Sequence, residues 1–188
     1  MLTRCPVSAF CIILLTQNGN EANPFCHGIQ GIVGAYQQAI QAYQLWGPTN
    51  FAPLINHVAG IAQGSLASAQ NGQVYFVLLI ITDGAITDRE DTITAIVAAA
   101  NLPMSIIIIG VGNADFGTME MLDGDGDALK NSRGEKAVRD IVQFVPFRLF
   151  HNNDQALAKE VLAELPNQVV EYQSKHGLRP HARGASVA

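Results

Sequence analysis

The chain has 188 residues, of which 48% are hydrophobic and 14% are charged, and its formal net charge at pH 7 is -5. This length suits one domain with a substantial core and is too short for two domains of ordinary size. The acidic balance and the lack of a Lys/Arg cluster exclude nucleic acid as an expected partner, because binding to phosphate backbones depends on cationic side chains. Cys5, Cys11 and Cys26 are odd in number and lack metal-site spacing, which indicates a reducing compartment rather than a disulfide framework.

The N-terminal stretch allows two interpretations. Arg4 followed by the apolar run 5–15 has the basic start and short apolar core of a secretory signal peptide. No clear small-residue cleavage site follows, and the run is far shorter than the roughly 20 residues that a membrane-spanning helix requires. The other interpretation is a strand over residues 7–15, which are rich in β-branched and aromatic side chains.

Two helices are predicted next along the chain. Apolar side chains recur at three- and four-residue steps over residues 28–43, which places them on one face of a helix that ends at Gly47-Pro48. A second helical pattern runs over residues 51–62. Residues 64–72, rich in Ser, Gln and Asn, predict a surface loop.

Two uninterrupted apolar runs predict buried parallel strands. Residues 74–81 have no polar alternation, so we expect a central strand that is covered on both faces. A helix with an acidic first turn is predicted from Ile86 to Ala100, and Pro103 ends it. The second run, residues 104–111, completes a βαβ unit, whose crossover is almost always right-handed.

The rest of the chain predicts shorter elements. Residues 113–135, rich in Gly and Asp, are expected to form an irregular loop, followed by a short helix over 136–145 and a brief edge strand over 147–150. An amphipathic helix is predicted over 154–175, with Pro166 kinking or dividing it. Together these elements predict the α/β class, with a doubly wound, mainly parallel sheet flanked by helices.

Asp83 is the leading candidate for a functional residue. The loops at the carboxyl ends of parallel strands form the usual binding crevice, and Asp83 lies there, after the apolar run 74–81. A carboxylate at that place costs free energy unless something pairs with it, and a hard divalent cation would do so. The alternative is that Asp83 caps the turn that follows, where Asp is favoured.

Thr49 is the second candidate. It lies in the tight loop 47–50 between two predicted helices, and its hydroxyl is able to coordinate a metal. Thr49 or Asn50 equally suits the N-cap of the helix that begins near Phe51, since both residue types are favoured there.

A run of alternate aspartates, Asp123, Asp125 and Asp127, resembles the opening of a calcium-binding EF-hand loop. That template requires Gly at its sixth position and Glu at its twelfth, but this sequence has Ala128 and Gly134 there. A solvated acidic loop is therefore the preferred interpretation.

The sequence offers little for catalysis. No nucleophile motif of the Gly-x-Ser-x-Gly kind and no phosphate-binding Gly-x-x-x-x-Gly-Lys-Ser/Thr loop occurs in it. The histidines fall mostly on predicted helix faces or in the tail and are expected to be exposed to solvent: His27, His57, His151, His176 and His181.

Several long strings resemble the von Willebrand factor A type domain of the copine family. They are residues 45–53, 80–88, 102–116, 121–125, 139–147 and 161–166. The resemblance implies an intracellular protein that recruits protein partners, located in the cytoplasm and peripherally at the plasma membrane. It also implies calcium-dependent phospholipid binding through two C2 domains, which are absent from this chain.

Such an A-domain binds a divalent cation through three loops, and the resemblance carries two of them to this chain. Thr49 matches the threonine of the second loop and Asp83 the aspartate of the third, but no Asp-x-Ser/Thr-x-Ser motif of the first loop occurs. With so few ligands, we predict weak or absent binding of magnesium, calcium or manganese.

The resemblance divides the chain into three parts. Residues 1–22 are a divergent segment, 23–177 a partial A-domain that is incomplete at its N-terminal part, and 178–188 a disordered tail. Losing the strand beside residues 74–81 leaves an apolar edge open to aggregation, so we hypothesise that residues 7–15 pair with that edge as a substitute strand.

A protein-binding adaptor module, and not an enzyme, is the function these observations favour. A small α/β hydrolase or transferase is the alternative from another class, because similar sheets host many enzymes. The copine-like ubiquitin ligases would require a zinc-binding Cys/His cluster, which this sequence lacks.

Overall fold

Helices and strands alternate along the chain in the computed structural model, which describes residues 26–42, 47–68, 74–124, 128–150 and 152–178. The elements in chain order are α2 (Gly28–Ala42), α3 (Ala52–Ser68), β1 (Phe76–Thr82), α4 (Arg89–Ala99), β2 (Met104–Gly110), α5 (Gly117–Asp123), β3 (Val142–Pro146), the 3-10 helix η1 (Phe147–Phe150), α6 (Asp154–Val161) and α7 (Leu165–Lys175). The structure therefore has the predicted α/β class.

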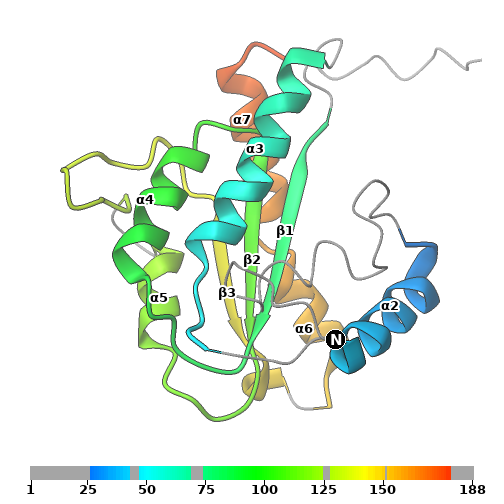
Figure 1. Ribbon diagram of the computed structural model, residues 1–188. Coiled ribbons are helices and arrows are strands. Elements are labelled where there is room, and N and C mark those ends of the chain that lie inside the picture. Colours follow the sequence, from blue (N-terminus) through cyan, green and yellow to red (C-terminus); the bar gives the residue numbers. More distant parts are fainter. Residues whose placement is uncertain (1–25, 43–46, 69–73, 125–127, 151, 179–188) are drawn as a thin grey trace, which may run out of the picture.

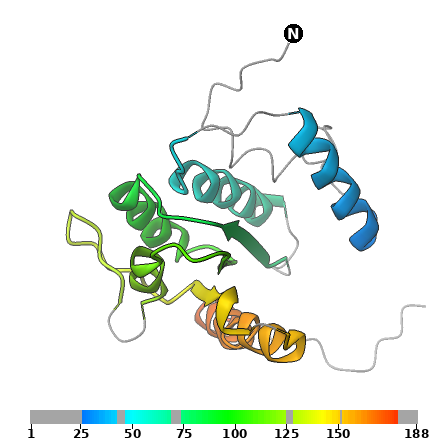
Figure 2. The ribbon, with the colours of Figure 1, turned by 90° about the horizontal axis from the view of Figure 1, so that it is seen from below.

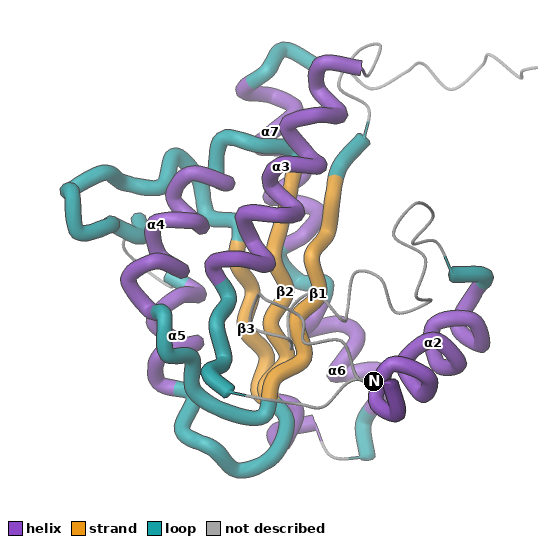
Figure 3. Tube along the Cα trace, viewed as in Figure 1, coloured by secondary structure: helices purple, strands orange, loops and turns teal. Residues whose placement is uncertain are grey.

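The described strands form one parallel sheet in the order β1-β2-β3 (Figures 1 and 3). Its strands point the same way because a helix connects β1 to β2, and the longer segment containing α5 connects β2 to β3. In register, Thr82 lies beside Gly110, and Gly110 beside Pro146. The carboxyl ends of all three strands therefore lie at the same edge of the sheet.

Helices cover both faces of this sheet, as the view along the layers shows (Figure 2). Helices α3, α4 and α5 lie on one face, and α6 and α7 lie on the other, where they contact β3 and β2. The apolar core lies on the first face, where alternate strand residues such as Leu78, Ile80, Ile106 and Ile108 pack against α3 and α4. This is the doubly wound arrangement that the sequence predicts.

Strand β2 is the central strand and is buried on both faces, which confirms its prediction from an uninterrupted apolar run. The corresponding prediction of a central strand over residues 74–81 does not hold among the described residues, because β1 lies at the edge of the described sheet. Its side chains alternate between the core and an outer face on which Val77, Leu79 and Ile81 are 46%, 48% and 48% exposed. Helices α6 and α7 cover β2 and β3 on that face and leave β1 open.

Helix α2 forms where the sequence predicts it, but its apolar face is exposed. Ala35 and Ala39 are buried, whereas the large apolar side chains at helical spacing face solvent: Ile29, Ile32, Val33, Tyr36 and Ile40. The helix lies on the β1 side of the sheet and makes no extensive contact with another described element (Figures 1 and 2).

Several boundaries differ from those predicted. Helix α3 continues to Ser68, so the predicted loop 64–72 begins too early, and α5 forms within the predicted loop 113–135. Residues 136–145 are not a helix: β3 begins at Val142, because a short apolar run suits either period. Residues 147–150 form a 3-10 helix rather than a strand.

The C-terminal helix is divided, as predicted. Helix α6 ends at Val161 and α7 begins at Leu165, with Pro166 in its first turn, where the missing N–H costs nothing. Among the described helices, none combines the length and the apolar composition needed to cross a bilayer. The signal-peptide and substitute-strand interpretations of residues 1–16, the tail from residue 179, and Asp125 and Asp127 all lie outside the described residues.

Candidate functional site

The carboxyl ends of the three strands form the rim at which the sequence places its candidate residues. The loop 83–88 follows β1, the loop 111–116 follows β2, and η1 follows β3. Gly110 ends β2 beneath the rings of Phe116 and Phe144, and a Cβ there would lie only 2.9 Å from the Phe116 ring. The absence of a side chain at Gly110 thus lets this aromatic pair close the rim from below.

Hydrogen bonds join the loop of Thr49 to the loop of Asp83. The carbonyl oxygen of Thr49 accepts from the Thr87 amide at 2.9 Å and from the Thr87 hydroxyl at 3.1 Å. The same hydroxyl also lies 2.6 Å from Oδ1 of Asn50. The structure therefore brings together two loops that are more than thirty residues apart in the sequence.

Asp88 strengthens this junction and was missed as a site residue from the sequence. Its carboxylate oxygens accept from the amides of Phe51 and Ala52 at 3.0 and 2.9 Å, which caps the N-terminus of α3 from a different loop. Oδ1 also accepts from the hydroxyl of Thr92 at 3.1 Å. The prediction that Thr49 or Asn50 caps this helix was wrong, because Asp88 receives the first amides of α3.

Asp83 lies one residue beyond β1 and is exposed. Within the described parts of the chain, its carboxylate has neither a hydrogen bond nor an ion pair, so the alternative that it caps the following turn has no support there. Its neighbour Thr82 is buried, and the Thr82 hydroxyl donates to the carbonyl of Gly84 at 3.3 Å. The rim therefore presents the Asp83 carboxylate to solvent.

The donors at the rim fit a divalent cation poorly. The nearby carboxylate of Asp88 is committed to α3, and that of Asp115 accepts from the amide of Gly117 at 2.9 Å. Asp83 and the half-buried Thr49 are the two ligands that the sequence predicts, and the described residues contain no group of three His, Cys, Asp or Glu side chains suited to a metal. Magnesium requires near-octahedral oxygen coordination, so these two side chains alone do not supply a site.

The comparison with known families agrees with this fold. A family model described as Copine matches residues 9–181. The chain belongs to the copine family. The matched range includes every described element from α2 to α7, and it begins 14 residues before residue 23, the predicted start of the partial A-domain.

In this copine-family chain, Asp123 binds the backbone of strand β3. It is buried at the end of α5, and its Oδ1 accepts from the amide of Phe144 in β3 at 2.7 Å. Gly124 follows with φ 67°, the left-handed conformation that ends a helix and favours glycine. An inward carboxylate that is already bonded does not suit a calcium loop.

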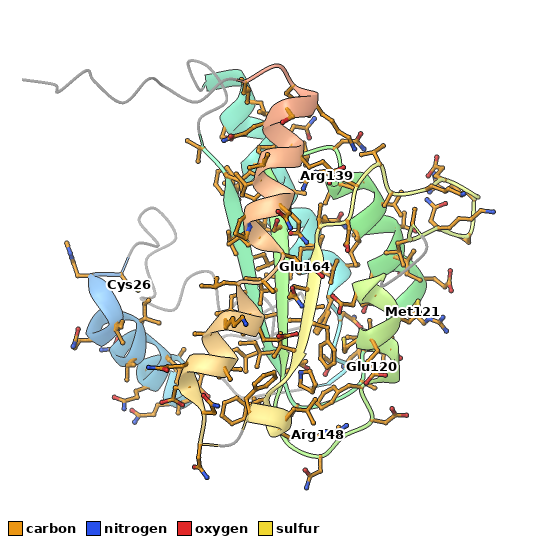
Figure 4. The ribbon with its side chains drawn as sticks, turned by 180° about the vertical axis from the view of Figure 1, so that it is seen from behind. Cys26, Glu120, Met121, Arg139, Arg148 and Glu164 are labelled. Carbon is orange, nitrogen blue, oxygen red and sulfur yellow. The ribbon has the colours of Figure 1, made fainter. Side chains whose placement is uncertain are left out.

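Arg139 is a second residue that the sequence did not single out. It is buried at the end of the sheet opposite the rim, while Arg148 lies near the rim (Figure 4). The guanidinium donates to the carbonyl oxygens of Ala100, Leu102 and Met104 and to the hydroxyl of Tyr75. Only the fold could reveal it, because these acceptors lie more than thirty residues away.

Tyr172 of α7 packs beside this buried arginine. Its ring centroid lies 5.3 Å from the Arg139 guanidinium carbon and 5.9 Å from the Tyr75 ring. Burial raises the pKa of the Tyr172 hydroxyl, and the positive charge of Arg139 offsets part of that rise. Arg139 therefore ties α7 to the amino ends of the strands.

Neither the histidines nor the cleft beside α4 and α5 indicates a catalytic centre in this copine-family chain. His27, His57 and His176 are exposed as predicted, and Nδ1 of His176 contacts the carbonyl of Tyr172, not a nucleophile. The cleft is lined by two acidic and two basic side chains, which favours no charged substrate: Arg89, Glu90, Glu120 and Lys130.

Proposed function

We propose that this copine-family chain is a protein-binding adaptor module whose partner-binding surface is the rim at the carboxyl ends of β1 and β2. The observation that carries the proposal is the exposed Asp83 carboxylate, which has no partner among the described residues and lies on a rim held by the Thr49–Thr87 hydrogen bonds. An exposed carboxylate on a rim whose loops are joined by hydrogen bonds suits recognition of a basic group on a partner.

The same proposal assigns the module a binding role rather than an enzymatic one. The rim offers a carboxylate and hydroxyls, but the described residues bring no histidine or cysteine to it. We place this role in the cytoplasm. The plasma-membrane location that the resemblance implies belongs to the complete family and depends on its C2 domains, not on this module.

Affinity capture with a charge variant tests the proposal. Immobilised chain is incubated with cell lysate with and without divalent cations, captured proteins are identified, and the binding of each is measured again with purified components. Asp83→Ala is expected to weaken binding of true partners about tenfold, as one lost charge-assisted contact implies. The matched control is Asp91→Ala, which removes an exposed carboxylate from α4.

Equal binding by the Asp83 and Asp91 variants would refute the rim as the binding surface. Calorimetric titration with magnesium tests the cation separately, and we expect no binding tighter than millimolar because the ligands are too few. Micromolar affinity that Asp83→Ala abolishes would contradict that expectation.

A further inference from the structure

The outer edge of β1 presents unpaired backbone groups. Phe76 donates its amide to Pro103, and Thr82 accepts from Val111, so both ends of β1 direct their backbone groups toward β2. Successive residues of a strand direct these groups to opposite sides. The amides and carbonyls of Val77, Leu79 and Ile81 therefore point away from β2, to a side where the described residues supply no strand.

The side chains of the same three residues make this edge apolar. Val77, Leu79 and Ile81 also occupy the outer face of β1, where each is nearly half exposed. The seven residues of β1 include no charge and no proline, the two features that commonly keep an edge strand from pairing. An uncharged edge of this length is a ready template for another strand.

We propose that residues 7–15 of the same chain add to this edge as a fourth strand. These residues lie outside the described part of the chain, and their sequence, VSAFCIILL, has nine residues without charge, against seven in β1. No Asp, Glu, Lys or Arg occurs from Cys5 to Asn20. An apolar run of this kind gains most by leaving water, and among the described residues the β1 edge is an apolar surface that also offers backbone hydrogen bonds.

The linker makes an intramolecular pairing the favoured one. Residues 16–27, a segment of 12 residues, connect the run to the start of α2 and can span about 40 Å when extended. Helix α2 lies on the β1 side of the sheet in both views (Figures 1 and 2). A tethered strand competes at an effective concentration near the millimolar range, above that of a second copy in a dilute solution.

Disulfide trapping tests this pairing directly, because Cys11 stands at the centre of residues 7–15 and Leu79 at the centre of β1. The full chain with Leu79→Cys is prepared with Cys5→Ser and Cys26→Ser, so that two thiols remain. Central residues meet whether the strands run parallel or antiparallel. Their Cα separation would then fall within the 4.4–6.8 Å that a disulfide accepts, as an order-of-magnitude guide.

Mild oxidation of the monomer is expected to link Cys11 to position 79, with a yield about tenfold above that of a control carrying Leu149→Cys. Leu149 is 71% exposed and follows β3, on the opposite side of the sheet. Variants with Val77→Cys or Ile81→Cys in place of Leu79→Cys would form the disulfide with Cys11 instead if the register of the strands is shifted by two residues. Circular dichroism verifies that each variant is folded.

Three outcomes would overturn the proposal. Disulfides between chains at position 79 would assign the edge to a second copy. If the disulfide yields with cysteine at positions 77, 79 and 81 are no higher than in the Leu149→Cys control, residues 7–15 do not pair with the β1 edge. Recovery from cells of a folded, monomeric chain that lacks residues 1–16 would show that the segment is removed as a signal peptide.

Discussion

The two edges of the sheet are built differently. On β3, the outward-facing residues are Val142, Phe144 and Pro146, since Ile141 is bonded to β2 through Ile106. The amide of Val142 donates to Asp140 at 3.0 Å, that of Phe144 donates to Asp123 at 2.7 Å, and Pro146 has no N–H. On β1, none of the outward amides has a partner among the described residues.

This difference shows that a sheet edge can be protected by a few side chains beside its own strand. Two aspartates and a proline block the β3 edge, beside which the described residues place no further strand, and natural sheets use such local features to avoid pairing with other chains. The β1 edge lacks all three devices and also exposes an apolar face. This difference between the two edges is the reason to assign the proposed added strand to β1.

The largest expected effect on stability is at Arg139, at the end of the sheet opposite the rim. Arg139→Met should lower the free energy of unfolding by at least about 3 kcal/mol, because the carbonyls of Ala100, Leu102 and Met104 each lose a charge-assisted hydrogen bond. Chemical denaturation measures the loss. Arg148→Met is the matched control, since its exposed guanidinium makes one carbonyl contact at 3.4 Å, and it should cost less than about 1 kcal/mol. Equal losses would remove the special role of Arg139.

A pair of truncations compares the central strand with the open one. Ile108→Ala should cost about 2–5 kcal/mol, because Ile108 is fully buried in β2 and its removal leaves a cavity. Leu79→Ala should cost about 1 kcal/mol or less, because its side chain is already half in water. Midpoints of urea unfolding give both values. A Leu79 variant as damaging as the Ile108 variant would mean that the outer face of β1 is fully covered.

Removing the Asp123 carboxylate, which accepts from an outward amide of β3, should open the β3 edge as the β1 edge is open. Asp123→Ala leaves the buried amide of Phe144 without its acceptor, which should cost about 1–3 kcal/mol and increase self-association. Unfolding and light scattering are measured together. Asp115→Ala, an exposed residue bonded to Gly117, is the control and should change neither. If the Asp115→Ala variant also self-associates, net charge rather than protection of the β3 edge governs solubility.

The smallest effect expected is a loss of stability at alkaline pH. The pKa of Tyr172 is raised above its ordinary value of 10.0 by burial, so the folded state holds this proton more tightly than the unfolded state. The contribution is fully present below pH 10 and is lost as the pH rises through the folded pKa. Ultraviolet titration follows the ionisation, and Tyr172→Phe should flatten the decline in stability. A decline that persists unchanged in Tyr172→Phe would contradict this assignment.

The sequence predicts the sheet better than its edges. The runs that form β1 and β2 are both rich in aliphatic side chains, and both are strands, but this composition does not show whether a neighbouring element covers each face. β3 was missed because Ile141, Val142 and Val145 suit a helical spacing as well as an extended one. A five-residue strand gives too little pattern to decide between them.

The candidate site was predictable in part. Placing Thr49 and Asp83 in loops at one rim follows from the positions of the strand ends, and the Thr49–Thr87 bond joins those loops. The cap of α3 was not predictable, because Asp88 lies 36 and 37 residues from the amides that it bonds. From its neighbours in the sequence, Asp88 is assigned to the acidic start of α4. Whether Asp83 binds a cation stays a prediction.

Residue-resolved amide hydrogen exchange tests the difference between the two edges most directly. It is measured on the full chain and on a variant that lacks residues 2–16. We expect the Phe144 amide to be protected in both, and the amides of Val77, Leu79 and Ile81 to be protected in the full chain and to exchange at least about tenfold faster in the variant. Rapid exchange at Leu79 in the full chain, or undiminished protection in the variant, would contradict the assignment of residues 7–15 to the open edge.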